Sequence, residues 1–478
     1  IHRVDYAHVP EPYEFWDIEN KAPVGATHLR VEIRSLGGAA LQVVKVMLWM
    51  DGVQVEAHPD GRQGALAFSF DWETAMGGAI HSKGMAVHDP VAAAEHGIDM
   101  RQGADWLNDL FVRNSISATF YGTGYNLLDG NTERRTFSGD PIYDWASHEN
   151  RWETDYWTTH PWYGDDPYGT YQNQPAWYFG DQTRKLLAAG HEIGSHTFGH
   201  IYVRGSNVMS MTADTDEWLS AAKAIGVPPP TTFAFPWRSS NSLKDDMYGM
   251  LYSKGIRAVT RIYALDMVDP YTVGAVKTFP PMAVMPDFLL GGASSIAGEE
   301  AEGATIGAEQ GLHVIDETLA RRGTTSFWTH PEQLADDPAF ASDRQSWQRV
   351  VEAAAQERDR GRLWIDTVAH ITAYEAGVSG VTTSLEQGFM GLGGWQLKVN
   401  NDSEHELKGV TLTLPGDVRN ASAGEVGLRT VQVADDGAVH LSESDSPTFP
   451  ARQIVIENLP PGITTIGIEW AAGQEPPR

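Results

Sequence analysis

The sequence contains no cysteine, no apolar run long enough to cross a membrane, and comparatively few basic residues. The absence of cysteine excludes disulfides, thiol nucleophiles and thiolate metal ligands. No stretch reaches the roughly 18 apolar residues of a spanning helix, so no membrane span is expected. With 35 Lys and Arg against 63 Asp and Glu, the formal net charge is −28, which repels nucleic acid and anionic membranes. Neutral or cationic partners, including glycans that carry free amines, are not excluded.

The chain begins at Ile1 rather than at a methionine. A removed signal peptide would leave such a start, as would trimming of the chain. If a signal peptide was removed, we expect an extracellular or cell-surface protein. The 478 residues exceed one ordinary domain, so two or three domains are expected.

The two ends of the chain are expected to be β-rich. Residues 1–63 contain the stretches THLRVEIR and LQVVKVMLWMDG, which alternate polar and apolar residues as strands do. Residues 378–478 contain short strand-like runs separated by turn residues, and helical patterns stop there. We therefore predict a short N-terminal β region and a C-terminal β-sandwich-like domain.

Residues 64–377 form the predicted main domain. Short apolar runs such as ALAFSFDWE, HEIGSHTF and TTSFWTHP alternate with amphipathic helical stretches such as MRQGADWLNDLFVRNS. Repeated strand–helix units predict an α/β fold in which helices cover a parallel sheet. Roughly seven repeats favour a closed, distorted (β/α) barrel over an open sheet. The carboxyl ends of such strands meet at one mouth, where active sites collect.

A long insertion, residues 125–180, interrupts this alternation. Flexible linkers contain few aromatic residues, so this aromatic-rich segment is expected to be an ordered loop. Its rings could form an apolar cluster beneath the loop, or exposed Trp and Tyr side chains could stack on sugar faces beside the site, and both could hold at once. The aromatic residues are Trp145, Trp152, Tyr156, Trp157, Trp162, Tyr163, Tyr168, Tyr171, Trp177 and Tyr178.

The run GHEIGSHTFGH contains two histidines four residues apart, His196 and His200. Neutral imidazole is a good ligand for zinc and similar ions, and this spacing can place both rings around one ion. Two hydrogen-bonded loop histidines without a metal would give the same short motif. Their position after a predicted barrel strand favours the metal interpretation.

Three further polar clusters follow other predicted strands. Asp71 and Glu73 lie at the end of one strand within SFDWE, and strand alternation places them on the same face. Trp237 follows another strand in AFPW, and His330 follows a third in WTH. A parallel barrel brings these strand ends to one mouth, together with the histidine pair.

These motifs resemble those of the polysaccharide deacetylase (NodB-homology) family, over a region of about 64–375. The run HTFGH, from His196 to His200, fits the family's His-(Ser/Thr)-x-x-His motif, and the preceding GHEIG fits its lead-in strand. The family's first motif supplies an aspartate base and an acidic metal ligand. Here SFDWE differs from the commoner adjacent Asp-Asp form and implies Asp71 as base and Glu73 as ligand, although Asp71 could ligate instead.

Two later family motifs are matched in part. The third usually reads Arg-x-Pro-Tyr, whereas AFPW places Ala234 at the arginine position. Arg238 and Arg261 are candidates for its replacement, and spacing assigns neither. The last motif, Leu-x-His in many members, is matched by WTH, which implies His330 as the general acid. Two aspartates are candidates for orienting this histidine: Asp266 and Asp269.

The resemblance implies a metal-dependent hydrolase. Asp71 would take a proton from the attacking water, and His330 would protonate the departing amine. The Trp237 backbone N–H would stabilise the oxyanion. The implied substrate is an N-acetylated or O-acetylated polysaccharide or peptidoglycan-type glycan. Three residues would hold a divalent ion, with zinc the expected metal: Glu73, His196 and His200.

Two other functions stay open at this point. The altered first motif, the missing arginine and the aromatic insertion would also fit a non-catalytic carbohydrate-binding protein on the same barrel. The same hydrolytic chemistry could instead act on a non-sugar amide. The sequence gives neither the sugar, the metal nor the oligomeric state.

Overall fold

The computed structural model describes most of the chain after residue 51. None of its described helices is both long and apolar enough to cross a membrane. The strands expected within residues 1–50 lie outside the described part. The described residues are 52–77, 89–138, 142–150, 152, 154–240, 243–263, 270–276, 282–291, 305–387, 394–424 and 426–474.

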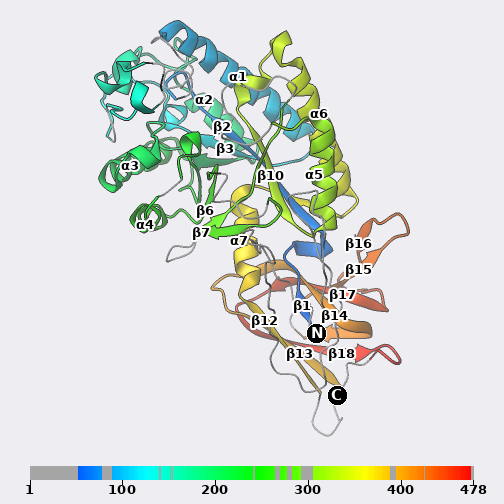
Figure 1. The fold of residues 1–478 in the computed structure, drawn as a ribbon. Helices are drawn as coiled ribbons and strands as arrows, with labels where there is room; N and C mark the ends of the chain where they lie inside the picture. The colour runs from blue at the N-terminus through cyan, green and yellow to red at the C-terminus, as the bar shows by residue number, and fades with distance from the viewer. Residues whose placement is uncertain are drawn as a thin grey trace, which may run out of the picture. The chain divides into compact units, whose positions relative to one another are not determined.

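A curled sheet with helices packed around it forms the main domain (Figure 1). In spatial order its strands are β7 (Gly274–Val276), β8 (Met282–Val284), β6 (Ala258–Thr260), β5 (Thr232–Ala234), β4 (Glu192–Ser195), β3 (Thr119–Gly122), β2 (Gly64–Trp72), β10 (Thr324–Thr329) and β9 (Phe288–Leu289), with β11 (Leu363–Ile365) also paired to β2. Every pairing is parallel except that of β7 with β8.

The predicted α/β class with a distorted barrel is therefore confirmed. The described sheet contains ten strands rather than about seven. The additional strands β7, β8 and β9 are only two or three residues long, too short to show a period in the sequence.

Seven helices accompany these strands in the described residues. The first begins at Pro90, ten residues before the predicted stretch MRQGADWLNDLFVRNS, because Asp89 caps the N–H groups of Val91 and Ala92, and Pro90 suits the first helical turn. The third ends at Gly226, whose φ of 82° is the left-handed conformation of a helix C-terminus. The helices are α1 (Pro90–Arg113), α2 (Gly180–Ala188), α3 (Val208–Ile225), α4 (Asp245–Ser253), α5 (Ala308–Ala320), α6 (Ala341–Asp359) and α7 (Val368–Ser379).

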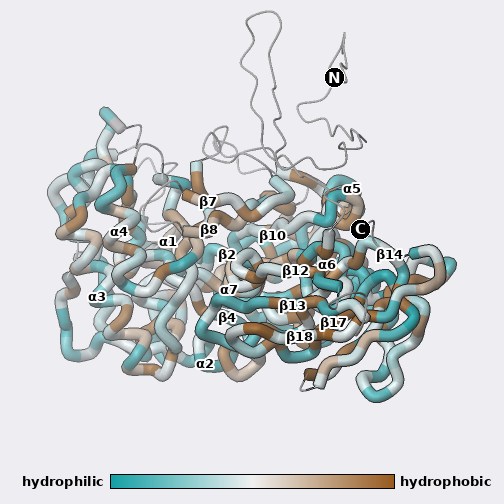
Figure 2. Tube along the Cα trace, turned by 90° about the horizontal axis from the view of Figure 1, so that it is seen from below, coloured by the Kyte–Doolittle hydropathy of each residue, from teal (hydrophilic) through white to brown (hydrophobic). Residues whose placement is uncertain are grey.

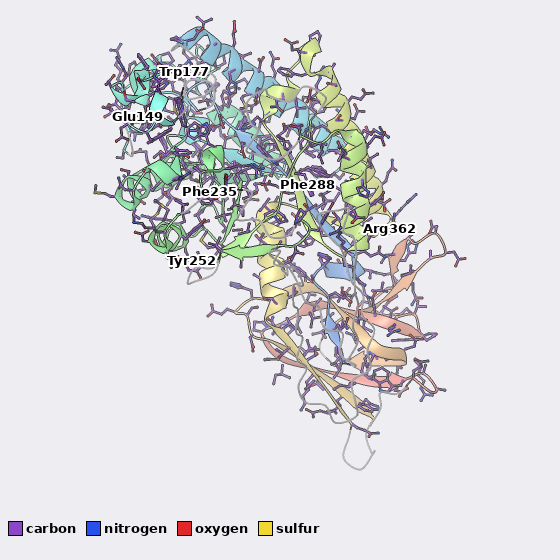
Figure 3. The ribbon with its side chains drawn as sticks, in the orientation of Figure 1. Glu149, Trp177, Phe235, Tyr252, Phe288 and Arg362 are labelled. Atoms are coloured by element: carbon purple, nitrogen blue, oxygen red, sulfur yellow. The ribbon has the colours of Figure 1, made fainter. Side chains whose placement is uncertain are left out.

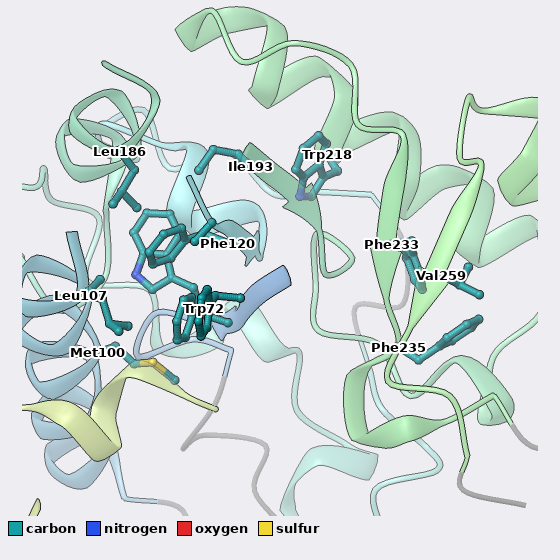
Figure 4. Packing of buried hydrophobic residues seen from close by; sticks show 14 of the residues in the cluster. Trp72, Met100, Leu107, Phe120, Leu186, Ile193, Trp218, Phe233, Phe235 and Val259 are labelled. Carbon is teal, nitrogen blue, oxygen red and sulfur yellow. The ribbon is translucent and has the colours of Figure 1, made fainter. Parts of the chain in front are cut away.

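Strand β2 lies inside the sheet, between β3 and β10, and all nine of its residues are buried. Its last residue, Trp72, packs against Phe120 and Phe179, with ring centroids 5.9 and 5.6 Å apart. Figure 4 shows Trp72 beside Met100 of α1, on the helix-covered face of the sheet. Alternation along the strand turns Asp71 to the opposite face. Hydrophobic and hydrophilic stretches alternate along the coloured part of the tube (Figure 2).

The aromatic insertion is an ordered loop with short 3-10 helices, and Glu149 and Trp177 mark it at one side of the domain (Figure 3). Asp166 anchors it by accepting hydrogen bonds from Tyr125 Oη at 2.5 Å and from Asn131 Nδ2 at 2.8 Å. The tryptophans are buried in the main core of the domain. Tyr156, Tyr163, Tyr168 and Tyr171 are only partly buried, so the cluster interpretation holds for the tryptophans. The five are Trp145, Trp152, Trp157, Trp162 and Trp177.

The C-terminal region is an antiparallel sheet, as its alternating sequence predicts. Strand β14 first pairs with β17 and, after a register shift between Thr413 and Val418, with β18, so both partners share one core. The pairing runs through one continuous path of strands rather than two separate sheets. Its elements are β12 (Val381–Gln387), β13 (Trp395–Asn401), β14 (Leu407–Ala423), β15 (Leu428–Val433), β16 (Val439–Leu441), β17 (Ala451–Leu459) and β18 (Gly462–Trp470).

One N-terminal strand is described, β1 (Gln54–Val55), and it pairs antiparallel with β14. The described end of the N-terminal region therefore belongs to the C-terminal sheet. The boundaries at 63/64 and 377/378 stay predictions.

Candidate active site

The predicted site residues lie at the carboxyl ends of neighbouring strands. Asp71 is the penultimate residue of β2, and Glu73 directly follows that strand. His196 and His200 follow β4, and His330 follows β10. The structure brings these side chains together, as expected for the mouth of a parallel barrel.

Glu73, His196 and His200 form a buried group whose potential ligand atoms all lie within 4.8 Å of one another. Glu73 Oε1 is 3.0 Å from His200 Nε2 and 3.5 Å from His196 Nε2. The three residues are 2%, 1% and 3% exposed. Two imidazoles and one carboxylate match the donor set of catalytic zinc sites that keep an open position. The geometry is thus consistent with a divalent metal site.

A backbone carbonyl fixes the orientation of the first histidine. His196 Nδ1 lies 2.9 Å from the carbonyl oxygen of Ala234. Because a carbonyl can only accept, Nδ1 carries the hydrogen and Nε2 presents its lone pair towards Glu73. Ala234, which lacks the expected arginine side chain, therefore contributes to the site through its backbone.

The loop that carries both histidines has an unusual backbone. Thr197 and His200 have φ angles of 64° and 53°, a region that side-chain-bearing residues seldom adopt. Such conformations persist where surrounding contacts enforce them. Here Asp214 of α3 accepts the N–H groups of Phe198 and Gly199, both at 2.7 Å.

The charges at this group suit a metal. Burial raises the pKa of the Glu73 carboxyl, but His200, His196 and His330 outweigh it and hold that pKa well below its ordinary value. Burial also lowers the pKa of His200, although the Glu73 carboxylate opposes this shift. Metal binding requires an ionised carboxylate and neutral imidazoles, and both shifts go in that direction.

Asp71 is held by an arginine that sequence spacing could not assign. Arg261 Nε lies 3.1 Å from Asp71 Oδ2, and both side chains are buried. His196 Nε2 is 3.5 Å from Glu73 Oε1 but 4.0 Å from Asp71 Oδ2. Glu73 is thus the carboxylate nearer to His196, and Asp71 contacts Arg261, while their roles as ligand and base stay predictions.

Arg261 is itself fixed by further buried contacts. Its Nη1 lies 3.1 Å from Asp287 Oδ2, and its Nη2 donates to Ser69 Oγ at 3.1 Å. Its guanidinium stacks 4.1 Å from the ring of Trp328. The other candidate, Arg238, donates to Asp287 Oδ1 at 2.9 Å. Burial raises the pKa of Asp287, but the two arginines reverse this and lower it to about 2.

The remaining predicted residues face the same group. His330 Nε2 lies 3.9 Å from Glu73 Oε1. The Trp237 ring lies 4.1 Å from the His200 ring. Their roles, as general acid and as oxyanion donor through the backbone N–H, stay predictions. The aspartates proposed to orient His330 lie outside the described residues: Asp266 and Asp269.

A fourth histidine, His96 on α1, lies beside the site and was missed in the sequence. Its Nε2 is buried and makes no hydrogen bond to the described residues. Burial lowers the pKa of His96 to about 4, and the charges of Glu73, His330 and His200 also act on it.

Close packing of α1 explains the position of this histidine. A Cβ on the next residue, Gly97, would come within 2.9 Å of the Ala75 nitrogen, so the helix approaches the segment that follows Glu73. His96 lies between Ala93 and Met100, which are both buried, at helical spacing. That spacing is the one signal that could have identified His96 from the sequence.

Comparisons with known proteins give one family match and several similar solved structures. The family described as Polysaccharide deacetylase matches residues 103–251, a segment that contains the histidine pair. No curated protein matches the chain. One similar solved structure is a probable polysaccharide deacetylase from Pseudomonas aeruginosa PAO1, at 15% identity and a TM-score of 0.41, covering 65% of this chain and 90% of that chain. A second is a Puue allantoinase, at 16% identity and a TM-score of 0.43, covering 66% of this chain and 92% of that chain. A third is the chitin deacetylase from the fungal pathogen Colletotrichum lindemuthianum, at 13% identity and a TM-score of 0.32, covering 66% of this chain and 89% of that chain. The chain thus contains a polysaccharide deacetylase family domain, matched over residues 103–251.

Proposed function

We propose that this protein is a metal-dependent hydrolase that removes acetyl groups from a polysaccharide or peptidoglycan-type glycan. One observation carries the proposal: a buried group of Glu73, His196 and His200 lies next to Asp71 and His330. A possible ligand set, a base and an acid are therefore within reach of one substrate.

The ligand set fits zinc best, because two imidazoles and a carboxylate are its usual catalytic ligands. An ion bound there would supply Lewis acidity and lower the pKa of its water towards neutrality. His196 is prepared for this role by its hydrogen bond to Ala234.

The protein side chains would move the protons. The Asp71 carboxylate accepts a proton as a water oxygen attacks the acetamide carbonyl carbon. The Trp237 N–H donates to the resulting oxyanion. When the C–N bond breaks, His330 gives its proton to the departing nitrogen. The products are acetate and a free amine, or acetate and a hydroxyl where the substrate is an ester.

Two observations weaken the alternative of a non-catalytic carbohydrate-binding protein. Arg261 supplies the cation beside Asp71 whose absence motivated that alternative. The tryptophans of the insertion are buried, which leaves their faces little surface for stacking on sugars.

Acetate release tests the proposal. Purified protein, metal-stripped protein and zinc-restored protein are each given acetylated chito-oligosaccharides, peptidoglycan fragments and acetylated xylan. We expect release from at least one of these glycans, lost on stripping and recovered with zinc. Turnover that persists after the metal is stripped would reject the metal mechanism. Activity on small amides alone would reject the glycan substrate.

A further inference from the structure

The aromatic insertion contacts the histidine loop directly. Phe198, which lies between the two histidine ligands, is fully buried. Its ring centroid lies 4.8 Å from that of Phe137 and 6.1 Å from that of Trp162, both in the insertion. Immediately before the insertion, the Gly124 N–H donates to the Phe198 carbonyl at 2.9 Å. A Cβ on Gly124 would overlap the Phe198 ring, so this close approach requires glycine.

A second contact reaches the residue before the second histidine. The buried Tyr143 hydroxyl of the insertion donates to the carbonyl oxygen of Gly199. A Cβ on Gly199 would come within 2.9 Å of this hydroxyl, so glycine is again what permits the contact. On the other side of the same residue, Asp214 accepts the Gly199 N–H. The peptide groups on both sides of Gly199 are thereby fixed.

A third contact reaches the ring of His200 through Trp237. Trp145 and Trp152 of the insertion pack against Trp237, with ring centroids 5.4 and 5.8 Å apart. Trp237 in turn lies 4.1 Å from the ring of His200. The insertion therefore supports both the backbone and the ring of this ligand.

We propose that the insertion positions the metal ligands: it holds the HTFGH loop in its metal-binding conformation before any metal arrives. The loop needs such support, because Thr197 and His200 have left-handed backbones that a free loop would leave. A preorganised site binds more tightly, since less ordering is required on binding. This inference rests on the proposed metal site and assigns Tyr143 as its main positioning residue.

Zinc affinity of the full chain, measured by competition with a chromophoric chelator, tests this inference. The test variant is Tyr143→Phe, which removes only the hydroxyl that contacts Gly199. The matched control is Tyr178→Phe, which removes a buried tyrosine hydroxyl of the same insertion that bonds Asp166 instead. We expect Tyr143→Phe to bind zinc about 10-fold or more weakly, and Tyr178→Phe to bind like the wild type. Metal-free melting curves report the fold separately.

Unchanged zinc affinity in Tyr143→Phe overturns the inference, as does an equal loss in both variants. If Tyr143→Phe does not fold, Phe137→Leu replaces it, because this change loosens the packing on Phe198; weaker zinc binding supports the inference and unchanged binding rejects it. A wild-type chain that binds no zinc rejects the proposed metal site itself and the inference with it. The two failures are therefore distinguishable.

Discussion

Arg261 Nε lies 3.1 Å from Asp71 Oδ2, although the two residues are separated by 190 positions in the sequence. Arg261 follows β6, whereas Asp71 is the penultimate residue of β2, so the contact depends on the curvature of the sheet. It provides the proposed base with a buried cationic partner.

Replacement of Arg261 should impair catalysis more than metal binding. Arg261→Met leaves Asp71 without its partner, and displacement of a catalytic group by about 1 Å costs on the order of 100-fold in rate. We expect a loss of kcat of that order in steady-state kinetics on an active glycan, with zinc content retained. The variant should also melt earlier, because the buried Asp287 loses one of its arginines.

Arg238→Met is the control for this change. Arg238 also pairs with Asp287, yet no contact joins it to Asp71 among the described residues. We expect lowered stability and a much smaller loss of kcat. Equal losses in the two variants would show that Arg261 acts only through the fold.

Variants at Asp71 and Glu73 should distinguish the general base from the metal ligand. Asp71→Asn should lower kcat by about 100- to 10,000-fold while zinc remains bound, because a general base contributes that much. Glu73→Gln should lose zinc, since it removes the only carboxylate of the ligand group. Elemental analysis and kinetics on both variants check this. Retention of zinc by Glu73→Gln together with its loss from Asp71→Asn would reverse the two assignments.

His96 should contribute to activity without holding the metal. Its Nε2 is buried without a hydrogen-bond partner among the described residues, and a bound substrate is one group that could satisfy it. His96→Leu should lower kcat/KM by about 10-fold, the value of one hydrogen bond to a neutral group, and His96→Gln should restore part of it. Wild-type kinetics in His96→Leu, or the loss of its zinc, would contradict this role.

His191 should make the fold sensitive to acid. Burial lowers the pKa of His191 from 6.5 to about 4, and its Nδ1 accepts the Ala118 N–H. The unfolded chain therefore takes up this proton first as the pH falls. The stabilisation is complete above pH 6.5 and is lost between pH 6.5 and about 4, by up to about 3 kcal/mol.

His191→Asn removes the titrating ring and keeps an acceptor for Ala118. Its free energy of unfolding, measured by urea titration across this pH range, should fall less steeply than that of the wild type. Parallel pH profiles for the two proteins would show that His191 is not a source of the acid sensitivity.

The strand–helix alternation and the four strand-end motifs were predictable from sequence because they are local patterns. Largely apolar runs such as Gly64–Trp72 identify buried strands, and alternation alone places Asp71 and Glu73 on one face. Arg261 could not be assigned, because its partner depends on which distant strands the sheet brings together. His96 lies in no motif, and only its place on the buried side of α1 sets it apart.

The aromatic insertion shows the same limit. Composition predicts that residues 125–180 are ordered, but tryptophans buried beneath a loop and tryptophans exposed to sugars give the same sequence pattern. What distinguishes them is contact with the HTFGH loop, such as that of Phe137 with Phe198. Such contacts form only when the insertion folds back over the end of β4.

Elemental analysis of the purified protein tests the central claim most directly. We predict about one equivalent of a divalent metal, zinc by preference, in the wild type and in His191→Asn, and its loss in His196→Ala and His200→Ala. His191→Asn is the control, because His191 is a buried histidine of the same run but is not part of the group around Glu73. A wild type without bound metal, or His196→Ala and His200→Ala variants that retain it, would contradict the account.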